Sequence, residues 1–321
     1  NKGVINMNNL KKIGLSALAG SLVATSAFAG EMSVAGSASI NVEHTNGGNG
    51  DAGKTFSMGN QLTFSGGGEL DNGLSVALSF VIDQGDDATT GVGSGPFDSH
   101  SVTISSDAMG SLKFSGEGGS SALTALDGTA AGDIWDSFDI ASTVHPTGLG
   151  GGNNSMMYTL PAMVDGVAIN ASYTPRGAAA DSSTAFGVTY TGVEGLSVSY
   201  GMGDGGNEAT DGTAFKMSYA FGPITAGYST YEHDTTGTAS DDDTTGYSIS
   251  YTVSDEISVS YGAEEVERGT LEDVETMKIS AAYTAGGMTI SGSMSEIDNM
   301  DGTTAATQDR DRWALGLSFA F

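Results

Sequence analysis

The segment 117–153 contains five carboxylates and neither a lysine nor an arginine. These carboxylates belong to Glu117, Asp127, Asp133, Asp136 and Asp139. Acidic groups gathered on one segment attract cations and repel anions. Residues 133–136 look helical for about one turn, and the apolar side chains of Ile134, Trp135 and Phe138 could fix that turn to a protein wall. The segment therefore predicts an electrostatic role, with its acids held in place by apolar anchors.

Residues that commonly act as catalytic bases are sparse in this chain. It contains no cysteine and four histidines, and we expect His44, His100, His145 and His233 to lie in loops. None of them has a fixed spacing to a serine that would indicate a nucleophile beside its base. We therefore predict that the protein is not an enzyme and that it needs no cofactor.

A second group of acids raises the question of a metal ion. Asp241, Asp242 and Asp243 are consecutive, and carboxylate oxygens of this kind are ligands that calcium prefers. Glu264 with Glu265 and Asp298 with Asp301 gather further carboxylates that we expect in loops. A solvated acidic rim is the alternative interpretation, so a structural calcium ion at Asp241–Asp243 stays an open prediction.

The elements that must position these groups are strands. From Trp313 to Phe321 large apolar side chains alternate strictly with Ala, Gly and Ser, and a period of two residues indicates a strand. The same alternation marks sixteen segments between residues 32 and 321, at Val34, Leu62, Leu78, Val102, Leu112, Tyr158, Ile169, Val188, Val198, Met217, Tyr228, Ile249, Val259, Ile279, Ile290 and Leu317. One apolar face and one small or polar face suit a wall between lipid and water.

The connections between these segments alternate in length. Seven are tight and rich in Gly, Asn, Asp and Pro, as hairpin turns require, for example 71–73 and 222–223. Eight are longer, polar and acidic, for example 43–54, 83–99, 232–244 and 296–309. Short turns on one side and long loops on the other are typical of a transmembrane antiparallel barrel, with the turns in the periplasm. We predict an all-β barrel of about sixteen strands.

Alternation also assigns the basic residues to a face. Lys113, Lys216, Lys278 and Arg312 fall on the small-residue face, which we expect to line the lumen. With acids on the segment 117–153 and these bases on the opposite wall, we expect a transverse field. Such a field orients dipolar solutes and disfavours uncharged apolar ones.

The chain begins with a segment that looks like a targeting sequence. Residues 7–12 are basic, residues 13–24 are mostly apolar, and Ala27-Phe28-Ala29 has the small residues of a cleavage site. We predict that residues 1–29 are upstream residues and a signal peptide, cleaved near Ala29, and that residues 30–321 form one barrel domain. The formal net charge of −28 would repel the phosphate backbone of a nucleic acid, so we predict no nucleic-acid partner.

The terminal strand that ends at Phe321 resembles the last strand of Gram-negative outer-membrane barrels. The segment 117–153, between the fifth and sixth strands, matches in position the loop that folds into the lumen of general diffusion porins, and its approach, Gly110 to Gly116, is also similar. The chain thus resembles a sixteen-stranded, trimeric outer-membrane porin. The resemblance implies that the segment 117–153 sets the constriction of the pore and that Phe321 belongs to a signal read by the barrel assembly machinery.

The function expected from the residues and the resemblance together is passive diffusion. Ions and small hydrophilic solutes would cross a water-filled channel that prefers cations. A solute-specific porin and a surface barrel acting as adhesin or receptor are the alternatives. The resemblance further implies a homotrimer in the outer membrane of a Gram-negative bacterium, in contact with lipopolysaccharide.

Overall fold

The protein is all-β throughout the part of the chain that the structure describes. This computed structural model describes residues 28–29, 32–47, 53–83, 98–123, 126, 128–138, 149–175, 182–205, 210–235, 241–269, 271–300, 302–304 and 308–321. Within these ranges the one regular helix longer than a single residue is the 3₁₀ turn η1 (Ile134–Phe138). The described residues contain no helix long and apolar enough to cross a membrane.

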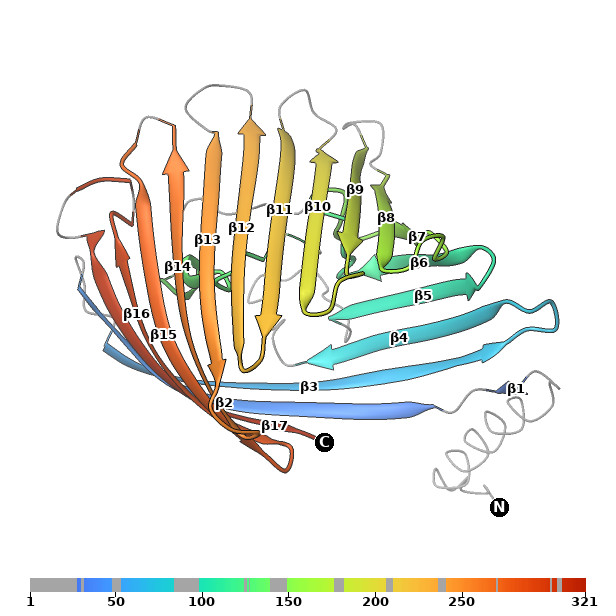
Figure 1. Ribbon diagram of the computed structural model, residues 1–321. Helices are drawn as coiled ribbons and strands as arrows, with labels where there is room; N and C mark the ends of the chain where they lie inside the picture. The colour runs from blue at the N-terminus through green and yellow to red at the C-terminus, as the bar shows by residue number, and fades with distance from the viewer. Residues whose placement is uncertain are drawn as a thin grey trace, which may run out of the picture.

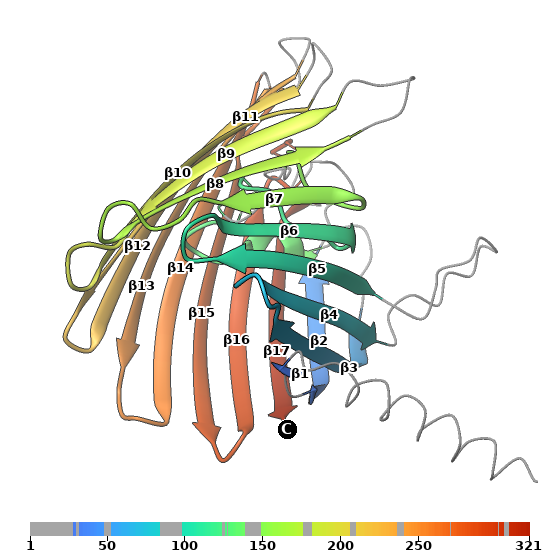
Figure 2. The same cartoon turned by 90° about the vertical axis from the view of Figure 1, so that its right-hand side faces the viewer.

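Sixteen strands, β2 to β17, form one closed antiparallel barrel (Figures 1 and 2). Each strand pairs with its neighbours in sequence, and β17 returns to pair with β2. The predicted strand number and fold class are confirmed. The strands are β2 (Ser33–Gly47), β3 (Gly53–Glu69), β4 (Ser75–Asp83), β5 (Ser99–Ser106), β6 (Gly110–Glu117), β7 (Ser155–Thr159), β8 (Val167–Thr174), β9 (Ser183–Tyr190), β10 (Leu196–Asp204), β11 (Thr210–Phe221), β12 (Ile224–Thr235), β13 (Asp242–Thr252), β14 (Ile257–Arg268), β15 (Val274–Ala285), β16 (Met288–Asp298) and β17 (Arg310–Ala320).

A further two-residue strand, β1 (Phe28–Ala29), pairs with Glu69 and Gly68 at the end of β3. It lies inside the segment predicted to be removed as a signal peptide, and it is not one of the sixteen strands of the closed barrel. Residues 1–27 lie outside the described residues, and cleavage near Ala29 stays a prediction.

The seven connections predicted to be tight join strands at one end of the barrel, and the other eight join them at the opposite end, where the strands themselves shorten several of the predicted loops. This alternation agrees with the sequence prediction. In the turn between β3 and β4, Gly73 has a φ of 79°, and its N–H donates to the carbonyl of Leu70 at 2.9 Å. A glycine is needed there because other residues rarely adopt a positive φ.

Several strands extend further into the long loops than the sequence indicated. β2 continues to Gly47, β12 to Thr235, and β13 begins at Asp242. The prediction that His44, His100 and His233 lie in loops is therefore wrong, because these residues belong to β2, β5 and β12; His145 lies outside the described residues. Strand ends beyond the lipid have water on both faces, so polar side chains extend the ladder there without an alternating pattern.

The two faces of the wall carry different side chains. Ten of the eleven tyrosines share the outward face with the large apolar residues, on β7 to β15. The exception is Tyr231, which points inward and is 4% exposed. Tyrosine rings suit the boundary between lipid and water, so the outward set is placed as an interfacial girdle. β2 to β6 contribute no tyrosine to this girdle.

Candidate functional site

The described residues of the long connection between β6 and β7 lie inside the barrel, against the wall formed by β8 to β16 (Figure 1). We call this connection, residues 118–154, the inner loop. Three polar contacts bind its first half to the wall. The N–H of Ala122 donates to Ser172 Oγ at 2.9 Å, and that of Ala130 donates to Ser229 Oγ at 2.8 Å. Between them, Lys216 Nζ donates to the carbonyl of Gly128 at 2.6 Å.

Inward-facing glycines give the inner loop its path along the wall. They lie on β9, β10, β12, β13 and β14, at Gly187, Gly201, Gly203, Gly227, Gly246 and Gly262. We call these six residues the glycine track. A Cβ at Gly201 would lie 2.6 Å from Leu126 Cδ1, and one at Gly203 would lie 2.7 Å from Leu149 Cβ. Because such contacts are far too short, the loop backbone rests where the wall has no side chains.

Apolar side chains fill the space between the loop and the first part of this track. Leu123, Leu126 and Leu149 from the loop form a buried cluster with Ala185, Ala214 and Tyr231 from the wall. Burial of a leucine side chain contributes about 1.5–3 kcal/mol, so these residues supply a substantial part of the docking energy. The inward position of Tyr231 is explained by this contact.

The loop tip is the 3₁₀ turn η1, and it packs on a second apolar cluster. Ile134 and Phe138 are buried with Val266 of β14, Val274 of β15, Ile297 of β16 and Met300. The sequence predicted both the helical turn and the anchoring role of Ile134, Trp135 and Phe138, all of which are buried. It did not identify the receiving residues, which interrupt the polar inner face of their strands.

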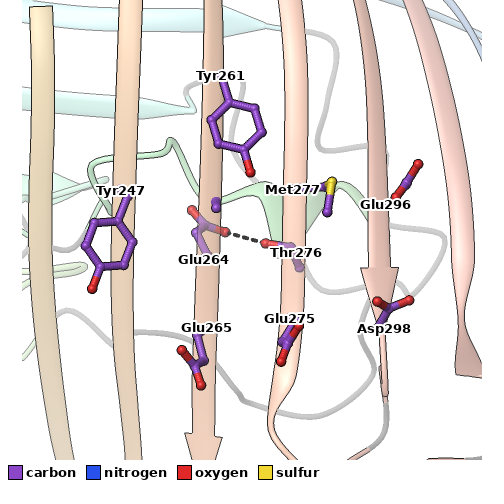
Figure 3. Close-up of a pocket in the computed structure, with 10 residues that line it drawn as sticks. Tyr247, Tyr261, Glu264, Glu265, Glu275, Thr276, Met277, Glu296 and Asp298 are labelled. Carbon is purple, nitrogen blue, oxygen red and sulfur yellow. Dashed lines mark hydrogen bonds between the residues drawn. The ribbon is translucent and has the colours of Figure 1, made fainter.

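A single carboxylate caps the tip. Glu264 of β14 points inward, is 3% exposed, and accepts the N–H groups of Ile134 at 2.7 Å and Trp135 at 3.3 Å. The hydroxyls of Thr129 and Thr276 also donate to it, the latter at 3.2 Å (Figure 3). A carboxylate at the first N–H groups of a helical turn satisfies donors that the turn itself leaves open. Glu264 is thus the polar tether of the loop, rather than the loop carboxylate that the sequence suggested.

The acids of the inner loop have different surroundings. Asp136 is exposed on η1, whereas Asp133 accepts the N–H of Thr129 at 2.8 Å and has a φ of 51°. Glu117 ends β6, opposite His100. Asp127 and Asp139 lie outside the described residues. Among the described acids of the loop, Asp136 is the one whose carboxylate has the clearest access to the lumen.

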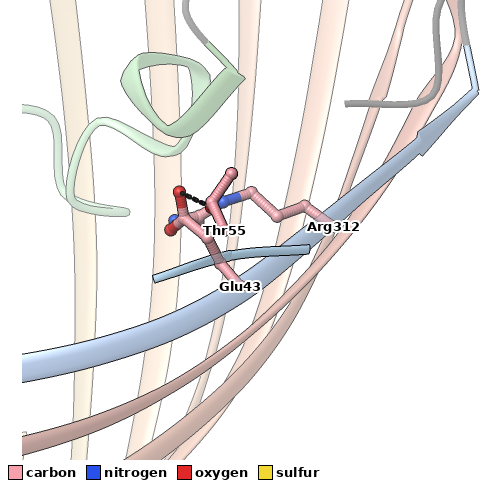
Figure 4. Close-up of polar contacts among 3 residues, drawn as sticks. All are labelled: Glu43, Thr55 and Arg312. Atoms are coloured by element: carbon pink, nitrogen blue, oxygen red, sulfur yellow. Dashed lines mark hydrogen bonds and ion pairs between the residues drawn. The ribbon is translucent and has the colours of Figure 1, made fainter. Parts of the chain in front are cut away.

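The four predicted lumen bases all point inward, but they do not form one wall. Lys113 lies on β6, Lys216 on β11, Lys278 on β15 and Arg312 on β17. Lys216 is on the wall that carries the loop and is bound to the Gly128 carbonyl. Arg312 forms an ion pair with Glu43 of β2, which also accepts a hydrogen bond from Thr55 at 3.2 Å (Figure 4). The expected row of bases opposite the loop is therefore not present in this form.

The geometry gives no support to calcium at Asp241–Asp243. Asp242 lies near Arg268, with Nε and Oδ1 3.9 Å apart, on the inner face of β13. Asp243 follows it in the strand and so points to the outer face. In the part of the chain that the structure describes, no three acidic or histidine side chains are placed to hold a metal ion.

A separate group of acids lies on the outer face. Glu265, Glu275, Glu296 and Asp298 of β14 to β16 line a groove of about 310 Å³ with Tyr247 and Tyr261 of the girdle (Figure 3). The sequence analysis expected Glu265, Glu296 and Asp298 in loops, whereas they lie in β14 and β16. Their outward direction keeps them away from the lumen.

The carboxyl-terminal residue completes the seam of the barrel. Phe321 and Gly36 exchange backbone hydrogen bonds of 3.0 and 2.7 Å beyond the last pair of β17 with β2. The Phe321 ring is 75% exposed and lies over Gly36, where a Cβ would come within 2.3 Å of it. Its outward position is the one expected of a lipid-facing residue.

Comparison with known proteins agrees with this architecture. Residues 14–270 match the family model for the Gram-negative porin. A search of curated proteins finds no significant match. OmpT of Vibrio cholerae without its loop L8 has a similar fold, with a TM-score of 0.67 and 16% identity over 90% of this chain and 99% of that chain. A substituted Rh. blastica porin gives 0.66 and 16% over 91% of this chain and all of the other.

Proposed function

The chain belongs to the Gram-negative porin family, and we propose that it forms a cation-preferring channel for passive diffusion of ions and small hydrophilic solutes. It is a channel-forming outer-membrane protein by family and fold. The cation preference, the kind of solute and the absence of catalysis go beyond what the family shows and are proposals. The acidic side chains of the described lumen support the cation preference, and membership of a family of channel proteins supports the absence of catalysis.

One observation carries the proposal, namely that the inner loop is bound along one side of an otherwise water-accessible barrel. The described residues of the loop occupy part of the lumen, and among them Asp136 has an exposed side chain. Charged side chains at a constriction set ion selectivity. The chain as a whole has 39 acids and 11 bases, so the long loops add a negative potential at the channel mouth.

We also propose a homotrimer that associates through the outer face of β17 and β2 to β6. This face carries large apolar residues such as Val34, Met58 and Leu78 but no tyrosine of the girdle, which is the pattern of a face covered by protein rather than by the lipid boundary. A native mass of one chain, with a single monomer band from the unheated sample, would contradict the trimer.

The remaining proposals concern export of the chain and its insertion into the outer membrane. We propose cleavage of the signal peptide near Ala29, recognition of the terminal Phe321 by the barrel assembly machinery, and contact of the outer face with lipopolysaccharide. The amino-terminal sequence of protein purified from outer membranes tests the first step directly.

The reversal potential of single channels in a KCl gradient tests the cation preference. Asp136→Asn should reduce it, because one lumen carboxylate is lost without a hydrogen bond of the loop backbone. The triple change of Asp133, Asp136 and Asp139 to Asn should reduce it further. Asp255→Asn, in a tight turn at the opposite end, is the matched control and should leave the potential unchanged. Anion preference in the wild type would contradict the proposal.

The preference should also depend on ionic strength. Exposed charges are screened over about 10 Å at 0.1 M salt. Raising KCl at a constant gradient ratio should therefore weaken the cation preference of the wild type more than that of the Asp136→Asn variant.

A further inference from the structure

The lumen face that the inner loop leaves uncovered is rich in hydroxyl groups, and its charged inward side chains are the acids Glu43, Glu69 and Asp83. It is formed by β2 to β5, whose inward residues include Ser39, Ser57, Thr63, Ser65, Ser79 and Ser101. The inward direction is fixed by Thr55, which donates to Glu43 in the lumen, and by the regular pairing of β3 with β4 and of β4 with β5. We call this face the hydroxyl wall.

The hydroxyl wall has no inward base. Lys54 is the one lysine or arginine between residues 33 and 106, and it lies on the outer face, paired with His44. Two shallow hollows of about 310 and 340 Å³ mark this wall where Gly59, Gly67 and Ala77 provide little or no side chain. The surface available to a solute therefore consists mostly of hydroxyls and small groups.

Two of the bases elsewhere in the lumen are bound to partners. Lys216 donates to the loop carbonyl of Gly128, and Arg312 is paired with Glu43. Lys113 on β6 lies at one edge of the hydroxyl wall, and Arg310 and Arg312 on β17 lie at the other. A pair of opposite charges in contact has a much weaker field at a distance than either charge alone. The acids of the loop therefore face a wall, β2 to β5, that carries no inward base of its own.

From this arrangement we infer that the pore admits uncharged polyhydroxylated solutes, such as small sugars and polyols, in preference to zwitterions of the same size. The inference rests on the proposed channel function. Solute hydroxyls exchange hydrogen bonds with water and with the serine and threonine hydroxyls at little net cost. The carboxylate of a zwitterion meets the acids of the loop and finds no fixed cation on the hydroxyl wall to offset that repulsion.

Osmotic swelling of proteoliposomes tests this inference with arabinose and glutamine, which have nearly the same mass. Arabinose should enter about threefold faster, the size of effect expected from one uncompensated charge contact at a hydrated surface. The double variant Ser65→Arg with Ser79→Arg places two bases on the hydroxyl wall, because these residues are cross-strand partners. It should reduce the ratio of arabinose to glutamine entry.

The control is Ser65→Gln with Ser79→Gln, which narrows the lumen with long polar side chains but adds no charge. It should slow both solutes and keep their ratio. The pair Ser101→Arg and Ser101→Gln repeats the comparison with one substitution, and heat-modifiable migration shows that each barrel is folded. A wild-type ratio of one or less, or equal ratios in the Arg and Gln variants, would overturn the inference. A wild-type protein that passes neither solute nor current would overturn the channel itself.

Discussion

Replacing Glu264 by alanine should release the tip of the inner loop without disturbing the barrel. The carboxylate of Glu264 accepts the backbone N–H groups of Ile134 and Trp135, and it is almost fully buried. An alanine has no acceptor to offer these donors. The ladder of β14 is made by backbone groups alone, so its pairing with β13 and β15 does not depend on this side chain.

The loss of docking free energy in the Glu264→Ala variant can be compared with the contacts that still hold the tip. A buried N–H left without an acceptor costs about 1–3 kcal/mol, so the two donors together weaken docking of the tip by about 2–6 kcal/mol. Ile134 and Phe138 keep their apolar contacts, each worth about 1.5–3 kcal/mol. The two contributions are of similar size, so the tip should be loosened rather than lost. Even 2 kcal/mol raises the undocked population about thirtyfold.

Single-channel recording in planar bilayers measures this change. A tip that undocks moves across the lumen, so the Glu264→Ala channel should show flickering and excess current noise that the wild type lacks. Glu264→Gln should be intermediate, because the amide oxygen accepts one N–H but the amide nitrogen is a donor. Glu265→Ala is the matched control, since the next side chain of β14 points to the outer face. A Glu264→Ala channel as quiet as Glu265→Ala would refute the role of Glu264 as tether.

Three further predictions concern other parts of the barrel. Gly201→Leu should push the loop toward the lumen and lower the conductance, because even a Cβ at this position would lie 2.6 Å from Leu126 Cδ1. Single-channel conductance in planar bilayers measures this effect. An unchanged conductance would argue against the role of the glycine track. Lys216→Met should increase current noise by removing the hydrogen bond to Gly128, with less effect than Glu264→Ala because one contact is lost instead of several. Phe321→Asp should sharply lower the amount of protein inserted into outer membranes, since a charge on the lipid face is unfavourable. Membrane fractionation and heat-modifiable migration measure the inserted amount. Normal insertion would show that Phe321 is not part of the assembly signal.

Much of the fold could be predicted because the side chains of each strand alternate between two different environments, lipid on one face and the lumen on the other. In the segment Trp313 to Phe321 the contrast between large apolar and small residues gives the strand, its faces and its exposure to lipid. Turns such as 71–73 carry the glycine that their geometry needs. These signals are local, so they require no knowledge of distant residues. Strand ends were missed because water on both faces removes the alternation there.

The attachment of the inner loop could not be predicted in the same way. Its anchors Ile134, Trp135 and Phe138 were identified, because apolar residues in an acidic segment need a place to be buried. Their partners are distant, and Glu264 lies 130 residues from Ile134 in the chain. One local clue was available, since alternation places Glu264 on the small-residue face of its strand, where an acid is unusual.

For the lumen bases, the sequence predicted the direction of each side chain but not its contacts. Alternation assigned Lys113, Lys216, Lys278 and Arg312 to the inner face, and the structure agrees. Their positions around the circumference depend on closure of the barrel, and the partner of Arg312 is Glu43, 269 residues away. The sequence therefore gave the direction of each base but neither its neighbours nor the charge that remains available to a solute.

The tether at Glu264 also has a consequence for the order of folding. Neighbouring strands pair through short turns, and such hairpins lose little chain entropy when they form. The tip of the inner loop reaches Glu264 only after β14 stands in the wall, and the glycine track that receives it spans six strands, from β9 to β14. Docking of the loop is thus a late event, separable from closure at the seam of β17 with β2. Narrowing of the lumen should therefore appear as a kinetic phase distinct from closure of the cylinder.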